Sequence, residues 1–566
     1  MDLTDIIYSN DYINILIQNY VAQSERYQML FPESSALLTL NPQYSVLFLE
    51  RSLLPENLFG AVPFTGLPKL FTPLSTLSLE VSGIVQTQNL YGGGYTGKNV
   101  IFGFLDTGID YRPPAFLHAN GQSRILAVWD QTDWTGTPPA QFPYGSLYTK
   151  SDLDAALESG DPLSLVPVTD PDGHGTYVAG VAGGTPDASA GFLGVAPEAD
   201  FAVVKLKPAK QNLKDFYLVS SNAPVFEEDD LLSAMHFLNE TAAAEGKPLV
   251  LCLALGTNQG SHSGTLPVSL TLARYGNTPG VIPVCATGNE GNASHHYYGS
   301  VSETYTPKNV EFLVSEGNRG FTLELWGQAP QLFSVGFRSP GGETIPRIPV
   351  SLNQEQRITF VLERTVIYVN YEVVQATTGS QLILIRMLDP TPGIWTLQVY
   401  RAFPSPPDFH IWLPITGFST SDVTFLEPDP YTTLTTPSAT VPVLSPSTYQ
   451  AANNSFSPES GRGFTRLGEI KPDFAAPGVS VTGPGPAGSY VSFSGSSASA
   501  AITSGAAALF LQWGIQRTPA RYFTAQEVKN YLIRGADRTD TITYPSREWG
   551  YGRLQLYQSF TSLMTN

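Results

Sequence analysis

The chain has 566 residues, of which 42% are hydrophobic and 14% are charged, and it contains 51 glycines and 45 prolines. This composition excludes a disordered chain and predicts two or three folded, turn-rich domains. The net charge of −18 argues against binding of nucleic acid or anionic membranes, because both require clustered positive charge. No apolar run reaches the roughly 18 residues of a spanning helix, so no membrane span is predicted.

The start of the chain and its cysteines indicate the cellular compartment. Residues 1–20 carry acids where a secretory peptide would carry lysine or arginine, and no small-residue cleavage site follows an apolar stretch. We therefore expect no signal peptide and cytoplasmic synthesis. The two cysteines, Cys252 and Cys285, lie in apolar runs typical of buried strands, which favours buried thiols over a disulfide.

Residues 1–75 predict a small α+β domain. A helix is expected over residues 12–24, and the runs at residues 36–40 and 44–50 are typical of strands. A passage rich in proline and glycine follows, from Leu67 to Pro73. None of the chemical motifs described below lies in this part of the chain.

Residues 76–299 predict an α/β domain. Apolar strands are expected at residues 99–106, 199–206, 248–256 and 280–288, and helix-like stretches such as residues 229–246 separate them. Strands that alternate with helices in this way favour a doubly wound, mostly parallel sheet.

Residues 300–426 lose the helical signal and predict an all-β domain. Short alternating segments, such as residues 321–328 and 357–374, are separated by turn dipeptides such as Pro340-Gly341. This pattern favours a β-sandwich similar to a jelly roll. The α/β pattern resumes at residues 471–481 and continues through an expected helix at residues 498–513. Residues 427–566 are therefore expected to complete the α/β domain, with residues 300–426 inserted into it.

Three residues in glycine-rich frames carry the chemical signal. Asp106 in LDTGID ends an expected strand, at the sheet edge where doubly wound folds build their sites. His174 in DGHGTYVAG lies between two glycines and opens a helix of small residues. Ser497 in FSGSSASAA stands before an Ala/Gly/Ser helix, whose dipole favours developing negative charge. Each residue alone also has an ordinary structural interpretation, but the three together predict a serine protease.

A fourth residue, Asn289 in ATGNEGN, follows an expected strand, where its amide could donate to an oxyanion beside the backbone N–H of Ser497. A simple turn cap is the alternative interpretation. The sequence contains no HExxH motif, and the loop at residues 183–191 lacks a convincing set of oxygen ligands for calcium. We therefore expect no cofactor and no required metal. The remaining histidines have no comparable frame and are interpreted as surface or packing residues: His118, His236, His262, His295, His296 and His410.

These motifs resemble those of the subtilisin-like serine proteases, the subtilases. The resemblance covers residues 82–299 and 427–560, and the order Asp, His, Ser along the chain is the order found in subtilisin. It implies that Asp106 orients His174, that His174 deprotonates Ser497, that Ser497 attacks the scissile carbonyl and that Asn289 stabilises the oxyanion.

The resemblance also implies a groove in which a protein or peptide substrate binds as an added strand. Its expected lining residues are Leu253, Ala254, Leu255, Gly256, Ala286, Thr287 and Gly288. The family usually has threonine and proline where this chain has Ser496 and Ala501. Ser496 and Ser499 therefore remain alternative nucleophiles, although the alignment of Gly495 and Gly505 with the motif favours Ser497.

The domain order resembles that of the clostridial Csp germination proteases. That resemblance implies that residues 1–75 are a prodomain, a folding chaperone and inhibitor. It also implies self-cleavage between Leu70 and Ser82, after which the prodomain stays bound non-covalently in the cleft. The implied role is limited proteolysis of a spore cortex-lytic proenzyme, in a spore-associated protein. Two alternatives are a catalytically silent sensor or scaffold of the same family, and an α/β-hydrolase esterase, which the absence of a G-x-S-x-G elbow disfavours.

Overall fold

The computed structural model describes residues 3–19, 35–55, 58, 62–73, 82–89, 94–351, 355–517 and 522–562. A six-stranded sheet forms the centre, in the order β12 (Val281–Cys285), β10 (Leu249–Leu253), β5 (Ile101–Asp106), β8 (Asp200–Lys205), β6 (Ile125–Asp130) and β7 (Ser146–Thr149). Its strands are parallel except β7, which runs antiparallel to β6. The predicted α/β sheet is confirmed, and its continuous apolar runs fit strands that are buried on both faces.

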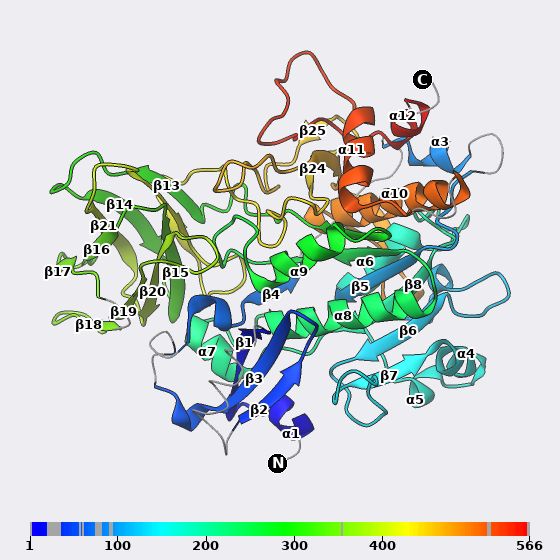
Figure 1. The fold of residues 1–566 in the computed structure, drawn as a ribbon, viewed down its shortest axis with the longest axis horizontal. Coiled ribbons are helices and arrows are strands. Elements are labelled where there is room, and N and C mark those ends of the chain that lie inside the picture. Colours follow the sequence, from blue (N-terminus) through cyan, green and yellow to red (C-terminus); the bar gives the residue numbers. More distant parts are fainter. Residues whose placement is uncertain are drawn as a thin grey trace.

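Helices cover both faces of this sheet (Figure 1). On one face α6 (His174–Gly183) packs against α10 (Ser496–Arg517), and on the other α8 (Glu228–Ala244) packs against α9 (Pro267–Gly276). Within the described residues, one stretch, Ser496–Gln516 of α10, is long and apolar enough to cross a membrane, and 89% of its most apolar window is buried inside the protein. Such burial is what a core helix shows, so length and composition alone do not indicate a membrane span.

The β-rich segment, residues 296–425, lies at one end of the molecule (Figure 1) and forms two antiparallel sheets. One sheet contains β13 (His296–Ser300), β22 (Asp408–Trp412), β15 (Gly320–Gly327), β20 (Gln381–Leu388), β19 (Val366–Glu372) and β18 (Gln356–Thr359). The other contains β17 (Thr344–Ile348), β16 (Phe333–Arg338), β21 (Gly393–Arg401), β14 (Lys308–Val314) and β23 (Val423–Phe425). Phe312, Ile385 and Trp395 belong to a hydrophobic core that is separate from that of the α/β sheet. The first strand begins at His296, earlier than the boundary at residue 300 that the sequence suggests.

The N-terminal segment, which we define as residues 3–73, begins with α1 (Leu3–Tyr8) and a three-stranded antiparallel sheet. Its strands are β1 (Tyr12–Gln18), β2 (Ser35–Thr39) and β3 (Tyr44–Glu50), in the order β1-β3-β2. The helix predicted over residues 12–24 is wrong for residues 12–18, which form β1, and residues 20–24 lie outside the described part. The reason is long-range pairing: Ile13 and Ile15 lie opposite Leu49 and Leu47 of β3. A β-branched residue at alternate positions fits such a strand better than a helix.

The remaining elements surround the sheet. The helices are α3 (Ile84–Gln88), α4 (Lys150–Glu158), α5 (Pro162–Leu165), α7 (Gln211–Tyr217), α11 (Ala525–Gly535) and α12 (Leu556–Thr561). Strand β24 (Pro446–Gln450) pairs with β25 (Ser455–Phe456) and with β26 (Phe474–Pro477), and the hairpin of β27 (Val481–Pro484) and β28 (Tyr490–Phe493) leads into α10. The short strands β4, β9 and β11 belong to the site and are described there.

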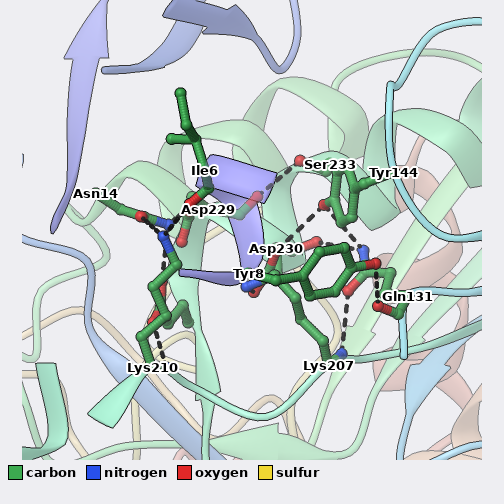
Figure 2. A network of polar contacts seen from close by, with 11 residues as sticks. Ile6, Tyr8, Asn14, Gln131, Tyr144, Lys207, Lys210, Asp229, Asp230 and Ser233 are labelled. Carbon is green, nitrogen blue, oxygen red and sulfur yellow. Dashed lines mark hydrogen bonds and ion pairs between the residues drawn. The ribbon is translucent and has the colours of Figure 1, made fainter. Parts of the chain in front are cut away.

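A buried polar network joins the N-terminal segment to the core (Figure 2). The Asn14 side chain, which is 3% exposed, donates through Nδ2 to Glu227 Oε2 at 2.8 Å and to Asp229 Oδ2. Its Oδ1 accepts from Lys210 Nζ at 2.7 Å, and Lys210 also donates to the carbonyl oxygen of Ile6. One amide thus satisfies two carboxylates and one ammonium that would otherwise be buried without enough partners.

The acidic residues of this network form a compact group. Ligand oxygens of Glu227, Asp229 and Asp230 lie within 4.8 Å of one another. Lys207 forms an ion pair with Asp230 at 2.6 Å, and Lys210 lies on the other side of the group (Figure 2). Burial and the charges of Asp230 and Glu227 raise the pKa of Asp229 well above its ordinary value, so the two lysines balance the other two carboxylates.

Candidate active site

Three side chains from three elements meet at the carboxyl edge of the central sheet. Asp106 is the last residue of β5, His174 the first of α6, and Ser497 lies in the first turn of α10. His174 Nδ1 is 2.7 Å from Asp106 Oδ1, and His174 Nε2 is 3.1 Å from the Ser497 hydroxyl. Residues that are 323 positions apart in the chain are thereby in hydrogen-bonding contact. Asp106 and Ser497 are buried.

The charge state of His174 depends on its acidic neighbours. Burial lowers the pKa of His174, but the charge and the hydrogen bond of Asp106, together with nearby acids, raise the pKa above its ordinary 6.5. Asp170 and Asp172 raise this pKa further. The arrangement therefore favours the imidazolium form, which is the state that His174 reaches when it accepts a proton from a hydroxyl.

A second buried acid, Asp170, lies behind the pair of Asp106 and His174. Its Oδ1 accepts from the Thr107 hydroxyl at 2.8 Å and from the Gly173 N–H at 3.1 Å. Its Oδ2 accepts from the Thr176 N–H at 2.8 Å and from the Thr176 hydroxyl at 2.7 Å. Sequence reasoning missed this residue, although an acid four positions before His174 in TDPDGHGT was the available signal.

Steric contacts explain why a glycine, Gly175, follows His174. A Cβ atom at Gly175 would lie 2.2 Å from the carbonyl oxygen of Gly108 and 3.0 Å from the Cβ of Asp106. The start of α6 can therefore approach the end of β5 only with a glycine at this position. This close approach is what brings the imidazole to the carboxylate.

Asn289 lies in the loop after β12 and contacts the start of α10. Its Oδ1 accepts from the Ser496 N–H at 3.0 Å, which leaves its Nδ2 group available to donate elsewhere. The Ser496 hydroxyl in turn accepts from the Gly288 N–H at 3.0 Å. The two hydrogen bonds fix the Asn289 loop against the helix that carries Ser497.

The three serines of the motif have different surroundings. Ser497 faces His174, whereas the Ser496 hydroxyl is directed to the Gly288 loop. The Ser499 hydroxyl contacts Thr448 at 3.0 Å and the carbonyl oxygens of β26. Of the three, Ser497 is the one that the fold places beside an imidazole.

The end of the N-terminal segment lies as a strand beside this site. Strand β4 (Leu70–Pro73) is the centre of a three-stranded antiparallel sheet, between β11 (Leu255–Gly256) and β9 (Phe226–Glu227). Pro73 lies opposite Leu255, and Thr72 lies opposite Gly256. The carbonyl oxygen of Ala254, just before β11, is 3.4 Å from the Ser497 hydroxyl. A segment of this chain thus occupies the position in which an added strand is predicted.

The other predicted lining residues form the adjoining wall. Leu253 ends β10, and its carbonyl oxygen accepts from the Ala286 N–H at 3.0 Å. The Thr287 hydroxyl donates to the carbonyl oxygen of Pro446 at 2.9 Å. Gly288 has a φ of +86°, and a Cβ there would lie 2.4 Å from Thr435, so this wall is closely packed.

The two cysteines and three of the other histidines pack against neighbouring side chains. Cys252 and Cys285 are free and buried, as predicted, and burial raises the pKa of Cys252 to about 12. The rings of His262, His296 and His410 stack around Trp412. These groups show the packing roles that the sequence suggests for them.

Comparison with known proteins shows the family of this chain. The model of peptidase family S8, the subtilase family, matches residues 97–552. The chain belongs to the subtilase family. The structure of the Clostridium perfringens CspB protease is 30% identical, with a TM-score of 0.75, and the match covers 86% of this chain and 98% of that one.

Two curated relatives are more distant. The subtilisin-like protease PopC of Myxococcus xanthus is 26% identical over 229 residues, which are 39% of this chain and 39% of PopC. The major intracellular serine protease of Bacillus subtilis is 21% identical over 266 residues, which are 47% of this chain and 65% of the relative. The chain thus spans less than two thirds of the length of either curated relative.

Proposed function

We propose that this subtilase is a serine endopeptidase whose catalytic residues are Asp106, His174 and Ser497. The observation that carries the proposal is the continuous line of contacts from the Asp106 carboxylate through the imidazole to the Ser497 hydroxyl. In the reaction, His174 Nε2 takes the hydroxyl proton while Ser497 Oγ bonds to the peptide carbonyl carbon. Asp106 holds Nδ1–H and stabilises the imidazolium.

The oxyanion of the tetrahedral intermediate requires donors that are already in place. Asn289 Oδ1 accepts from the Ser496 N–H, and this contact holds the Asn289 amide beside the residue that precedes Ser497. The amino end of α10 adds the backbone N–H of Ser497 and a favourable dipole. We infer that these two donors form the oxyanion hole.

We further propose that residues 1–75 are a prodomain that the enzyme cuts from itself, and that residues 300–426 are an inserted domain similar to a jelly roll. Strand β4 fills the groove, and its register predicts the bond that is cut. Pro73, the last residue of β4, lies opposite Leu255, and Leu255 follows Ala254, whose carbonyl oxygen is 3.4 Å from Ser497 Oγ. We expect cleavage after Leu74. The interval from Leu70 to Ser82, in which the sequence places the cut, lies partly outside the described residues.

Two measurements test this function. Wild type is expected to give fragments 1–74 and 75–566 by intact mass and, once the cut N-terminal segment has been removed, to react with a fluorophosphonate probe. Ser497→Ala is expected to do neither, and Ser492→Ala, a change at an exposed serine on β28, should behave as wild type. An unlabelled, uncut wild-type protein would support a catalytically silent family member. A cut Ser497→Ala protein would rule out self-processing.

The physiological substrate is a narrower proposal. The similarity to the Clostridium perfringens CspB protease over most of both chains supports a germination role. We propose limited proteolysis of a spore cortex-lytic proenzyme by a spore-associated protein that keeps its cleaved prodomain bound. Purified proenzymes incubated with wild type and with Ser497→Ala should be shortened by wild type alone. Equal stability in both incubations would contradict this substrate.

A further inference from the structure

Asp170 is connected to both members of the Asp106 and His174 pair through Thr107. The Thr107 N–H donates to Asp106 Oδ1 at 2.7 Å, the same oxygen that contacts His174 Nδ1 at 2.7 Å. The Thr107 hydroxyl accepts from the Gly175 N–H at 3.1 Å and donates to Asp170 at 2.8 Å. Thr107 is therefore fixed on one side by the acid that holds His174 and on the other by Asp170.

The same carboxylate also fixes the start of α6. Asp170 accepts from the Gly173 N–H just before His174 and from both the N–H and the hydroxyl of Thr176 just after it. The Thr176 hydroxyl accepts in turn from the Asp110 N–H at 2.9 Å, in the loop after β5. Asp170 is 2% exposed, so its four donors act on a desolvated carboxylate, where such hydrogen bonds are strong.

We propose that Asp170 is a positioning residue for the reaction of Ser497. It locks the loop that carries Asp106 to the helix turn that carries His174, so that the imidazole keeps its distance to both Asp106 and Ser497. The inference deepens the proposed function, because it assumes that His174 is the general base. A loss of positioning changes the turnover number more than substrate binding, since the groove of β11 and β9 does not include Asp170.

A neighbouring acid provides a matched control. Asp172 is exposed, and like Asp170 it raises the pKa of His174 through its charge. Asp170→Asn and Asp172→Asn each remove one negative charge near the imidazole, but only the first removes acceptors that fix the backbone. The shift of the pH midpoint therefore reports the charge, while the plateau of kcat reports the positioning.

The assay uses the full chain after self-cleavage and removal of the N-terminal segment that lies beside Ser497, with the chromogenic peptide Phe-Thr-Pro-Leu p-nitroanilide, which copies residues 71–74. Rates are divided by the number of sites that a fluorophosphonate probe titrates, so that misfolded protein is not counted. For Asp170→Asn we expect kcat at the pH plateau to fall roughly tenfold to a hundredfold, with KM within about threefold of wild type. For Asp172→Asn we expect a lower pH midpoint and a plateau within about twofold of wild type.

A second variant tests the link through Thr107. Thr107→Val keeps the N–H that holds Asp106 and removes the hydroxyl that contacts Asp170. Because both changes break the same link, the double variant with Asp170→Asn should lose less activity than the product of the single losses. A plateau kcat of Asp170→Asn equal to that of Asp172→Asn, or fully multiplicative losses, would overturn the inference. If wild type from which the cut N-terminal segment has been removed fails to react with the probe, it is the proposed function that fails.

Discussion

The buried amide of Asn14 is expected to contribute much of the free energy with which the N-terminal segment binds to the core. Its Nδ2 group donates to Glu227 and Asp229, and its Oδ1 accepts from Lys210 (Figure 2). Asn14→Leu keeps a similar volume and removes all three hydrogen bonds. The charged partners belong to the core and remain buried when the segment is bound.

The size of the effect follows from these partners. A buried donor or acceptor that loses its hydrogen-bond partner costs about 1–3 kcal/mol, and here three such groups are affected. They lie close enough to pair again with one another, because Lys207 and Lys210 flank the carboxylates, so the costs do not add fully. We expect a loss of about 3 kcal/mol, which is roughly a hundredfold in the dissociation constant of the cut segment.

The assay separates retention from self-cleavage. In a Ser497→Ala background, a recognition site for an added sequence-specific protease is placed between residues 73 and 82, and release of the cut segment is followed by size-exclusion chromatography. The control is Asn10→Leu, because Asn10 is exposed and lies at the same interface, where its Oδ1 accepts from the Gln211 N–H at 2.7 Å. The control should stay within about threefold of the parent. Release of Asn14→Leu no faster than that of Asn10→Leu would refute the reasoning.

Further outcomes follow from the site. Asn289→Leu should lower kcat by about 10²–10³ with little change in KM, and a change confined to KM would assign Asn289 to binding instead. The proposed mechanism requires neutral His174, and Asp106 raises the pKa of His174. The value of kcat/KM should therefore rise with pH through a midpoint above the ordinary 6.5. A midpoint below 6.5 would contradict the electrostatic argument. Gly175→Ala should lower both the melting temperature and kcat, because its Cβ would lie 2.2 Å from the Gly108 carbonyl oxygen. Calorimetry and the peptide assay measure the two effects, and an unchanged melting temperature and kcat would show that the contact relaxes.

The sequence alone predicted the chemistry and determined the main α/β architecture, because both depend on local patterns. Asp106, His174 and Ser497 each stand in a glycine-rich frame, and such frames reflect tight turns and close backbone approach. Apolar strands alternating with helices predicted the α/β sheet that the structure confirms. The assignment of roles to these residues stays a prediction until Ser497→Ala is measured.

Other features depended on contacts between distant parts of the chain, which no local pattern records. The run at residues 12–18 has the composition of either a helix or a strand, and only its pairing with β3 decides for the strand. The choice among the neighbouring serines likewise depends on which hydroxyl faces His174 once α6 packs against α10.

The tertiary structure also decided where strand β4 of the N-terminal segment lies and what supports the imidazole. Strand β4 has no chemical motif, and its place between β11 and β9 follows from backbone hydrogen bonds, which almost any sequence can make. Asp170 is an ordinary acid in the sequence until Thr107 and the turn around His174 fold onto it. Motifs thus predicted a reaction, whereas the geometry that brings Asp106, His174 and Ser497 into contact arose only when distant segments packed together.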